Sequence, residues 1–161
     1  MQQTTINAIQ AIQAMLTPAV GISAVALIML GLSNRFSSLF NRIRLLNDER
    51  RRLAEEFIGK GVLSYANNTR YMSIIKQNDE LLTRSMYIRN AILLMEGAIA
   101  FFVLSSIAIG LNMFFGEEFF TLVPFIIFII GMLFVLAGIT YAGLDVYHSY
   151  KIIQIEVKAE E

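Results

Sequence analysis

The sequence predicts an all-α membrane protein with three transmembrane helices and a long cytoplasmic helical hairpin between the first and second. The chain is 56% hydrophobic and only 16% charged, whereas soluble domains carry about 25% charged residues. Three stretches carry no charge, at residues 17–32, 97–116 and 119–144. A helix needs about 20 residues to cross a bilayer, and each stretch is near that length or longer. Eleven of the 13 Lys and Arg residues lie between the first two stretches.

The distribution of cations predicts the topology, because cytoplasmic loops are enriched in Lys and Arg. Apart from those eleven cations, only Lys151 and Lys158 remain, both near the C-terminus. We therefore place the N-terminus outside and the C-terminus inside. The expected segments are an extracytoplasmic amphipathic segment (1–16), transmembrane helix 1 (17–33), the cytoplasmic hairpin (34–90), transmembrane helix 2 (91–115), an external turn (116–120), transmembrane helix 3 (121–144) and a cytoplasmic tail (145–161).

The hairpin is expected to pack like a short coiled coil. One face of residues 34–58 carries apolar residues at spacings of three, four and seven, which is typical of a half-buried helix: Phe36, Phe40, Ile43, Leu46, Leu53 and Phe57. Gly59 and Gly61 then favour a turn at the hairpin tip, and a second helix is expected to begin near Asn67 or Asn68.

The first helix carries a graded stripe whose positions step by three and four. The stripe is polar at its outer end, small and apolar in the membrane, and basic at its inner end. Such a face fits either a packing seam between helices or the lining of a channel, with Ile28 as an apolar constriction. Its members are Asn7, Gln10, Ala14, Thr17, Gly21, Ala24, Ile28, Gly31, Arg35, Ser38 and Arg42.

Glu96 is an ionisable residue inside the predicted second span. An unpaired carboxylate in lipid is costly, so such groups pair or line a polar path. The three readings are a bridge to Arg35, a cation site or gate, and a wet position near the membrane interface. Glu117 and Glu118 form an acidic external turn that is either solvated or gathers cations in an oligomer.

Several residues are placed at the inner membrane boundary. Arg35, Arg42 and Arg44 are candidates to meet lipid phosphates. The tyrosines that follow the third span, Tyr147 and Tyr150, fit an aromatic belt beside Asp145 and His148, with a pH sensor at His148 as the alternative. The run of arginines at 50–52 is interpreted as a salt-bridged helix face, because Asp48, Glu49, Glu55 and Glu56 surround it.

The composition argues against several classes of function. The chain has no cysteine and one histidine, which excludes thiolate chemistry and any site that needs two histidines from one chain. The formal net charge is zero, so no nucleic-acid partner is expected. No P-loop, GxSxG, HExxH or GxGxxG motif is present. We therefore expect no catalysis, no catalytic residue, no metal site and no cofactor.

The run from Asn34–Arg35 to the segment RIRLLNDE at residues 42–49 resembles a known prokaryotic family, catalogued as domain of unknown function 2721. Pro18 and Ser23 in the first span, and the sequence RNAI at residues 89–92, belong to the same resemblance, which covers roughly residues 10–145. It implies a three-helix protein of the prokaryotic cytoplasmic (inner) membrane. It supplies no activity or ligand. The glycines at the hairpin tip depart from the usual hairpin.

The leading functional hypothesis is a homo-oligomeric, channel-like pore with the first helix around the axis. Arg35 and Arg42 would line its inner mouth, and Glu96 would hold the inner end of the first helix. The alternative is a non-conducting scaffold or signalling adaptor whose cytoplasmic hairpin binds a partner protein or anionic lipid. Membrane lipids, ions and further copies of the chain are the expected partners, and the sequence identifies no protein partner.

Overall fold

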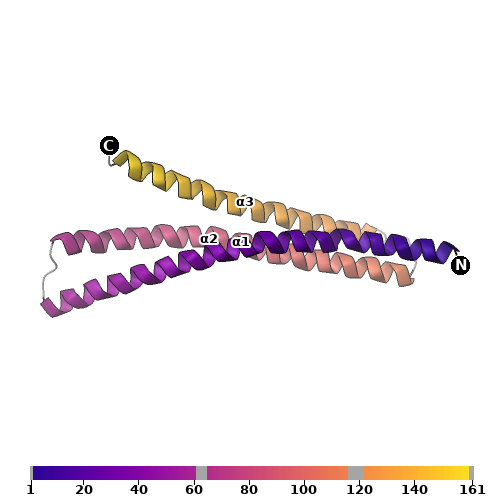
Figure 1. Ribbon diagram of the computed structural model, residues 1–161, viewed down its shortest axis with the longest axis horizontal. Coiled ribbons are helices and arrows are strands. Elements are labelled where there is room, and N and C mark those ends of the chain that lie inside the picture. The colour runs from indigo at the N-terminus through magenta and orange to yellow at the C-terminus, as the bar shows by residue number, and fades with distance from the viewer. Residues whose placement is uncertain (1, 61–64, 116–121, 160–161) are drawn as a thin grey trace. The chain divides into compact units, whose positions relative to one another are not determined.

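A computed structural model describes residues 2–60, 65–115 and 122–159, with side chains described at 12–56, 58, 67–112 and 122–148. Within these ranges the protein is entirely helical, with α1 at Gln2–Lys60, α2 at Tyr65–Phe115 and α3 at Leu122–Ala159 (Figure 1). Each helix contains a stretch long and apolar enough to cross a membrane. The all-α class and the three helices able to span a membrane are therefore confirmed, and the cytoplasmic orientation of the hairpin stays a prediction.

The helix ends differ slightly from the expected ones. α1 continues through Gly59 and ends at Lys60, and α2 begins at Tyr65, two residues before Asn67. Helix ends fray and are defined only to one or two residues, so a glycine near an end need not terminate the helix. Gly61, Glu117 and Glu118, with the rest of the expected external turn, lie outside the described residues.

The fold divides into two compact units. We call residues 1–32 and 90–142 the apolar unit, and residues 33–89 and 143–161 the charged unit. All 13 Lys and Arg residues of the sequence fall in the charged unit. The division of the fold therefore follows the division of charge along the chain.

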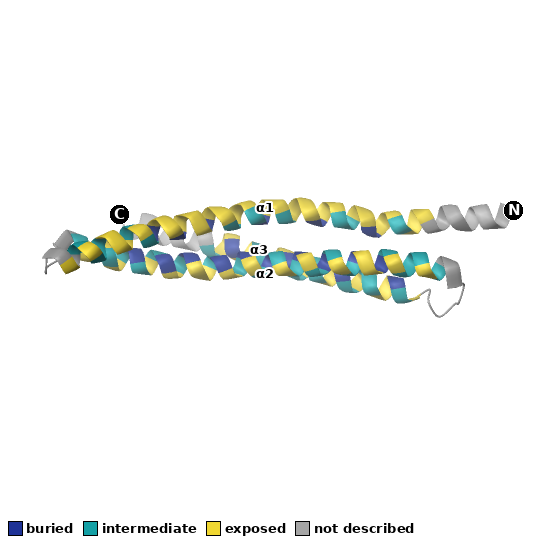
Figure 2. Cartoon of the chain, turned by 90° about the horizontal axis from the view of Figure 1, so that it is seen from below, coloured by how far each residue is buried: buried dark blue, intermediate teal, exposed yellow. Residues whose placement is uncertain are grey.

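Buried side chains recur along each helix at spacings of three, four and seven residues (Figure 2). This spacing keeps one face of a long helix against its neighbours, as in a coiled coil. On α1 the buried residues include Pro18, Val25, Leu32 and Leu39, and on α3 they are Pro124, Gly131, Gly138 and Asp145. On α2 they are Ile74, Asn78, Leu81, Ser85, Ile88, Ala91, Met95, Ala98, Phe102 and Ser105.

Phe102 is the centre of the apolar unit and is only 1% exposed. Its ring lies against Gly21 of α1 and Gly131 of α3, where an added Cβ atom would stand 3.1 Å and 2.8 Å from ring carbons. The ring also packs against Phe128 at a centroid distance of 5.3 Å. One turn along α2, the Ser105 hydroxyl donates a 2.9 Å hydrogen bond to the Pro124 carbonyl of α3. Small residues on two helices therefore make room for one large ring on the third.

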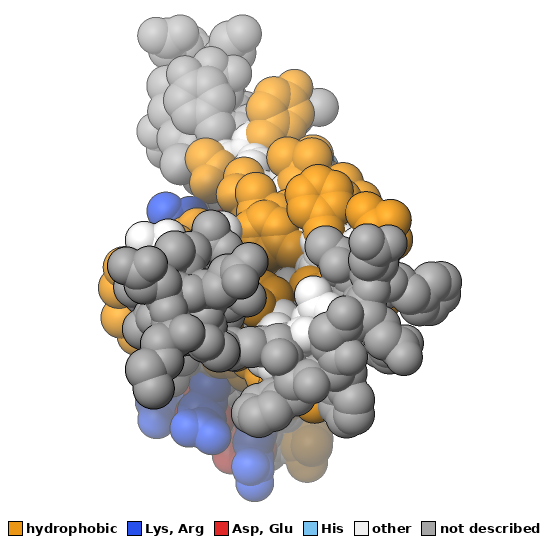
Figure 3. Space-filling view, turned by 90° about the vertical axis from the view of Figure 1, so that its right-hand side faces the viewer, with side chains coloured by type: hydrophobic (Ala, Val, Ile, Leu, Met, Phe, Trp, Pro, Cys, Tyr) orange, Lys and Arg blue, Asp and Glu red, His pale blue; other side chains and the backbone are white. Residues whose placement is uncertain are grey.

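Large hydrophobic side chains cover much of the outer surface of the apolar unit, and some of them are visible as uncovered side chains in Figure 3. Leu27 is 72% exposed, Leu122 67% and Val20 66%. Soluble monomers rarely leave such extensive apolar surface in water. The surface fits a lipid environment, in which exposed apolar side chains carry no penalty.

In the charged unit, α1 and α2 form an antiparallel helical hairpin. The Asn67 amide donates to Glu56 at 3.2 Å, and nearer the other end the Asn78 amide donates to Asn47 at 3.2 Å. Of the apolar stripe expected on residues 34–58, Ile43 and Leu46 are buried, and Phe36 and Leu53 are half-buried. Phe40 is 51% exposed, and the side chain of Phe57 lies outside the described residues.

We predict that Gly131→Ala destabilises the protein by about 1–3 kcal/mol, the usual cost of overpacking a core. The new methyl group would meet the Phe102 ring at 2.8 and 2.9 Å and the Phe101 Cβ at 3.2 Å. Gly143→Ala is the matched control, because no atom lies within 4 Å of an added Cβ there. Thermal unfolding in detergent, followed by circular dichroism, measures both variants. Equal stability of the two variants would contradict the packing around Phe102.

The ion pair between Glu49 and Arg70 gives a pH prediction. Arg70 Nε lies 2.8 Å from Glu49 Oε1. This hydrogen bond lowers the pKa of Glu49; desolvation opposes it, and the attraction of the Arg70 charge adds to the lowering. A lowered carboxyl pKa stabilises the fold above the ordinary value of about 4.3, and the contribution is lost as the pH falls through the lowered pKa. NMR titration of Glu49 should show the low pKa in the native protein and a return toward the ordinary value in Arg70→Gln.

Candidate functional site

Most of the graded stripe of the first helix is exposed along α1. In the apolar unit the exposed stripe residues are Ala14, Thr17, Ala24, Ile28 and Gly31. In the charged unit they are Arg35, Ser38 and Arg42. Gly21 is the exception, because it is half-buried against Phe102. The side chains of Asn7 and Gln10 lie outside the described residues.

The stripe is therefore not the seam by which α1 packs inside its own chain. That seam is the neighbouring face of α1, whose buried residues are spaced by seven, at Pro18, Val25 and Leu32. The stripe flanks this seam and leaves small and polar groups uncovered along the helix.

Glu96 is exposed on α2. It forms no ion pair with the described residues of its own apolar unit, which contains no Lys or Arg. The expected bridge to Arg35, which belongs to the charged unit, stays a prediction.

A cavity of about 330 Å³ lies in the apolar unit at the outer part of the stripe. Ala14, Thr17 and Pro18 of α1 line it, with residues from α2 and α3. Because proline has no N–H, Pro18 cannot donate the helical hydrogen bond to the carbonyl of Ala14. Apart from hydroxyl groups the lining is apolar: Ser105, Ile109, Pro124, Phe125 and Phe128 complete it.

A second cavity, of about 450 Å³, lies in the charged unit at the inner part of the stripe. We call it the arginine pocket, because three of the residues that line it are arginines. All three helices contribute, and the lining residues are Arg35, Ser38, Leu39 and Arg42 of α1, Arg84 and Ile88 of α2, and Asp145 and Val146 of α3.

Arg84 and Asp145 hold the arginine pocket together across α2 and α3. Arg84 Nε donates to Asp145 Oδ1 at 3.3 Å, and the two side chains are 26% and 5% exposed. A buried carboxylate needs such a partner, because its desolvation would otherwise be costly. Sequence reasoning missed this pair. The two residues are 61 positions apart, and no local pattern links them.

Arg35 and Arg42 are the uncommitted cations of the pocket. Both are exposed, and among the described residues neither has an ion-pair or hydrogen-bond partner. Arg44, the third residue expected to meet lipid phosphate, is also exposed on α1 but does not line the pocket. The structure therefore separates two of the three candidate arginines from the third.

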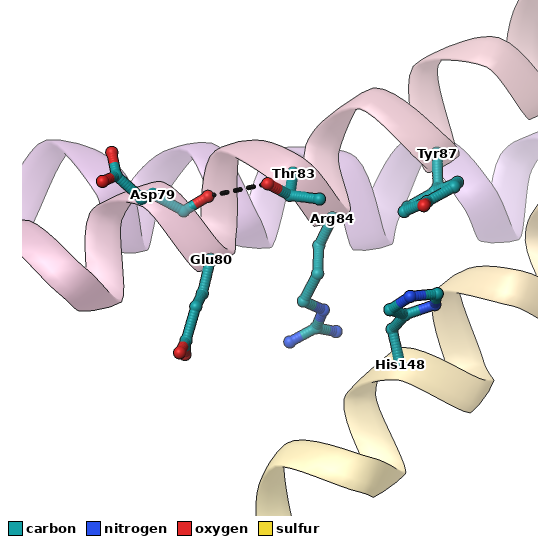
Figure 4. A pocket seen from close by; sticks show the side chains of 6 residues that line it. All are labelled: Asp79, Glu80, Thr83, Arg84, Tyr87 and His148. Atoms are coloured by element: carbon teal, nitrogen blue, oxygen red, sulfur yellow. Dashed lines mark hydrogen bonds between the residues drawn. The ribbon is translucent and has the colours of Figure 1, made fainter.

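A smaller cavity of about 280 Å³ shares Arg84 with the arginine pocket. Figure 4 shows Glu80 and Arg84 projecting from α2 to the side on which His148 rises from α3, whereas Asp79 points away. The Tyr87 and His148 rings stack at a centroid distance of 5.2 Å, and His148 Nδ1 lies 3.0 Å from the Leu144 carbonyl oxygen. His148 and Asp145 therefore help to pack α3 against α2. The sequence places them only at the membrane boundary, beside the tyrosines of the expected aromatic belt.

The comparisons with known proteins agree with this architecture. A family model described as a protein of unknown function (DUF2721) matches residues 15–155, which is most of the chain. The chain belongs to this family. No curated protein and no solved structure matches it. The resemblance seen at the inner end of the first span is thus confirmed, and DUF2721 carries no activity that could be transferred to the chain.

In this member of DUF2721, the described side chains form no group of three His, Asp or Glu residues that could hold a metal ion. The chemistry that the arginine pocket offers is instead the binding of an anion. Guanidinium groups donate hydrogen bonds in a planar fork that matches the oxygens of carboxylates and phosphates.

We predict that Asp145→Asn costs about 2 kcal/mol of stability, because it removes a charge-assisted hydrogen bond and leaves Arg84 partly buried without its carboxylate. Arg84→Gln should cost a similar amount, and the double variant less than the sum. The exposed pair of Arg51 and Glu55, 80% and 66% exposed, is the control, and Glu55→Gln should change stability by under about 1 kcal/mol. Additive effects in unfolding experiments would show that the buried pair is not coupled.

Proposed function

We propose that the protein forms a homo-oligomeric, channel-like pore in which the stripe of α1 faces the central axis. The exposure of this stripe carries the proposal. Small and hydroxyl-bearing residues at Thr17, Ala24 and Gly31 lie uncovered, while the adjacent face of the same helix is buried. In lipid, small residues on an exposed helix face favour the close approach of another helix.

A second copy is needed because three helices cannot enclose a continuous path by themselves. Glu96 supports the same conclusion, since its carboxylate is exposed on α2 within the apolar unit. A carboxylate facing lipid is costly, and intramembrane ionisable groups face a bundle interior or water. An oligomer would shelter Glu96 beside a neighbouring copy or a polar path.

The chemistry of the stripe changes along the proposed pore. Thr17 of the stripe lines the outer cavity. Ile28, three helical turns further along α1 and 40% exposed, would form the apolar constriction. Hydrophobic constrictions gate channels by excluding water. Arg35 and Arg42 would line the inner mouth, with the N-terminus outside and the C-terminus inside a prokaryotic cytoplasmic membrane. The permeant species would be an ion, and no catalytic step is part of the proposal.

The scaffold or adaptor function is the second candidate. It rests on apolar side chains of the hairpin that remain uncovered, chiefly Leu45 at 70% and Phe40 at 51% exposed. The burial of Ile43 and Leu46 removes much of the apolar stripe that first favoured it. The hairpin therefore offers a partner less surface than the sequence pattern indicates.

Cysteine crosslinking tests the axial arrangement, and the absence of native cysteine makes single substitutions clean. We expect Ala24→Cys and Ile28→Cys to give disulfide-linked dimers in membranes, because both positions would approach their copies at the axis. Val25→Cys, at a position that is 3% exposed, and Leu30→Cys, on a different exposed face, are the controls. Dimers at position 30 but not at 24 or 28 would place another face of α1 at the axis.

Conductance tests the pore itself. Purified protein in planar bilayers should give discrete currents, and the combined Arg35→Ala and Arg42→Ala changes should shift the preference from anions toward cations, because they remove positive charge from the mouth. Silence across voltage, pH and tension, from folded and oligomeric protein, would favour the scaffold.

A further inference from the structure

The arginine pocket has an excess of positive charge. Its lining includes three arginines, Arg35, Arg42 and Arg84, and one carboxylate, that of Asp145, which gives a formal net charge of +2. The Asp145 carboxylate is 5% exposed and is paired with Arg84, so its charge is used in the contact between α3 and α2. The charge that remains available inside the pocket comes from the two exposed guanidinium groups of α1.

These two guanidinium groups are well placed to act together. Arg35 and Arg42 are seven residues apart, which is two helical turns and about 10 Å along α1. Ser38 lies between them on the same lining and adds a hydroxyl that can donate a hydrogen bond. An anion with several oxygens meets donors of both kinds in this arrangement.

The rest of the lining is apolar, with Leu39, Ile88 and Val146. All three wall segments adjoin the apolar unit in the sequence: Arg35 lies three residues after Leu32, Ile88 two residues before Asn90, and Asp145 three residues after Ala142. A ligand in this pocket would thus meet positive charge and apolar surface together, at the level where each helix passes from apolar to charged sequence.

From these observations we propose that the arginine pocket binds a phosphate group through Arg35 and Arg42. Arg84 also lines the pocket, where its ion pair with Asp145 holds it in place. A phosphate carries the negative charge that offsets the excess, and its oxygens match the guanidinium fork. The group can belong to an anionic phospholipid headgroup or to a soluble phosphate. This proposal is independent of conduction, because it concerns binding to each copy of the chain.

The test compares two arginines that are only two residues apart on α1. Arg42→Gln removes a pocket residue, whereas Arg44→Gln removes the same charge at nearly the same depth outside the pocket. Binding of short-chain phosphatidylglycerol to the purified protein in detergent is measured by native mass spectrometry, with zwitterionic phosphatidylcholine as the reference lipid. Binding of inorganic phosphate to the same samples is measured by calorimetry.

We expect Arg42→Gln to weaken phosphatidylglycerol binding by about fivefold and Arg35→Gln with Arg42→Gln by more than tenfold, since each basic residue near a lipid surface contributes about 1 kcal/mol. Arg44→Gln should bind as the native protein does. Arg42→Lys should restore part of the affinity, because lysine keeps the charge and loses the planar fork. Circular dichroism checks that each variant is folded.

The two ligands separate the two sources of the phosphate. Arg42-dependent binding of phosphatidylglycerol alone identifies a lipid headgroup site, and Arg42-dependent binding of inorganic phosphate identifies a site for a soluble phosphate. The proposal is overturned if neither ligand binds, or if Arg42→Gln and Arg44→Gln weaken binding equally. The second result would mean that only the general positive charge of α1 attracts the anion.

Discussion

The structure depends on the recurrence of buried residues every three, four and seven positions along each long helix. Because this spacing keeps one face turned inward, α1 can run for 59 residues while Pro18, Val25 and Leu32 stay on the same seam. Small residues such as Gly131 then allow close approach in the apolar unit, where the packing of side chains replaces the hydrophobic effect as the force between helices. The charged unit uses the same spacing with polar pairs added at the hairpin.

The buried face also decides which residues remain for function. On α1 the stripe with Ala24 and Gly31 is left uncovered because the neighbouring face is already used inside the chain. The exposed Glu96 on α2 adds a polar group that lipid cannot satisfy. The proposed assembly of several copies would account for both features, since it would cover the small residues and remove the carboxylate from lipid.

The arginine pocket and the proposed pore have a physical connection. Arginines at a channel mouth repel cations, so the positive charge of Arg35 and Arg42 would influence which ions enter the proposed pore. A phosphate bound between them would neutralise much of that field. Asp145 does not have this effect on its own, because it is already paired with Arg84. Occupancy of the pocket would therefore link lipid or phosphate to the selectivity of the mouth.

The sequence by itself determined the features that depend on short stretches of chain. The three helices able to span a membrane follow from apolar runs, and the family follows from a local motif. Only the tertiary structure decided which faces meet. It placed Phe102 between Gly21 and Gly131, paired Arg84 with Asp145, and separated Arg44 from the pocket that Arg42 lines. The reason is physical: spacing along a helix tells which residues share a face, whereas the partner of that face is fixed by packing between segments far apart in the sequence.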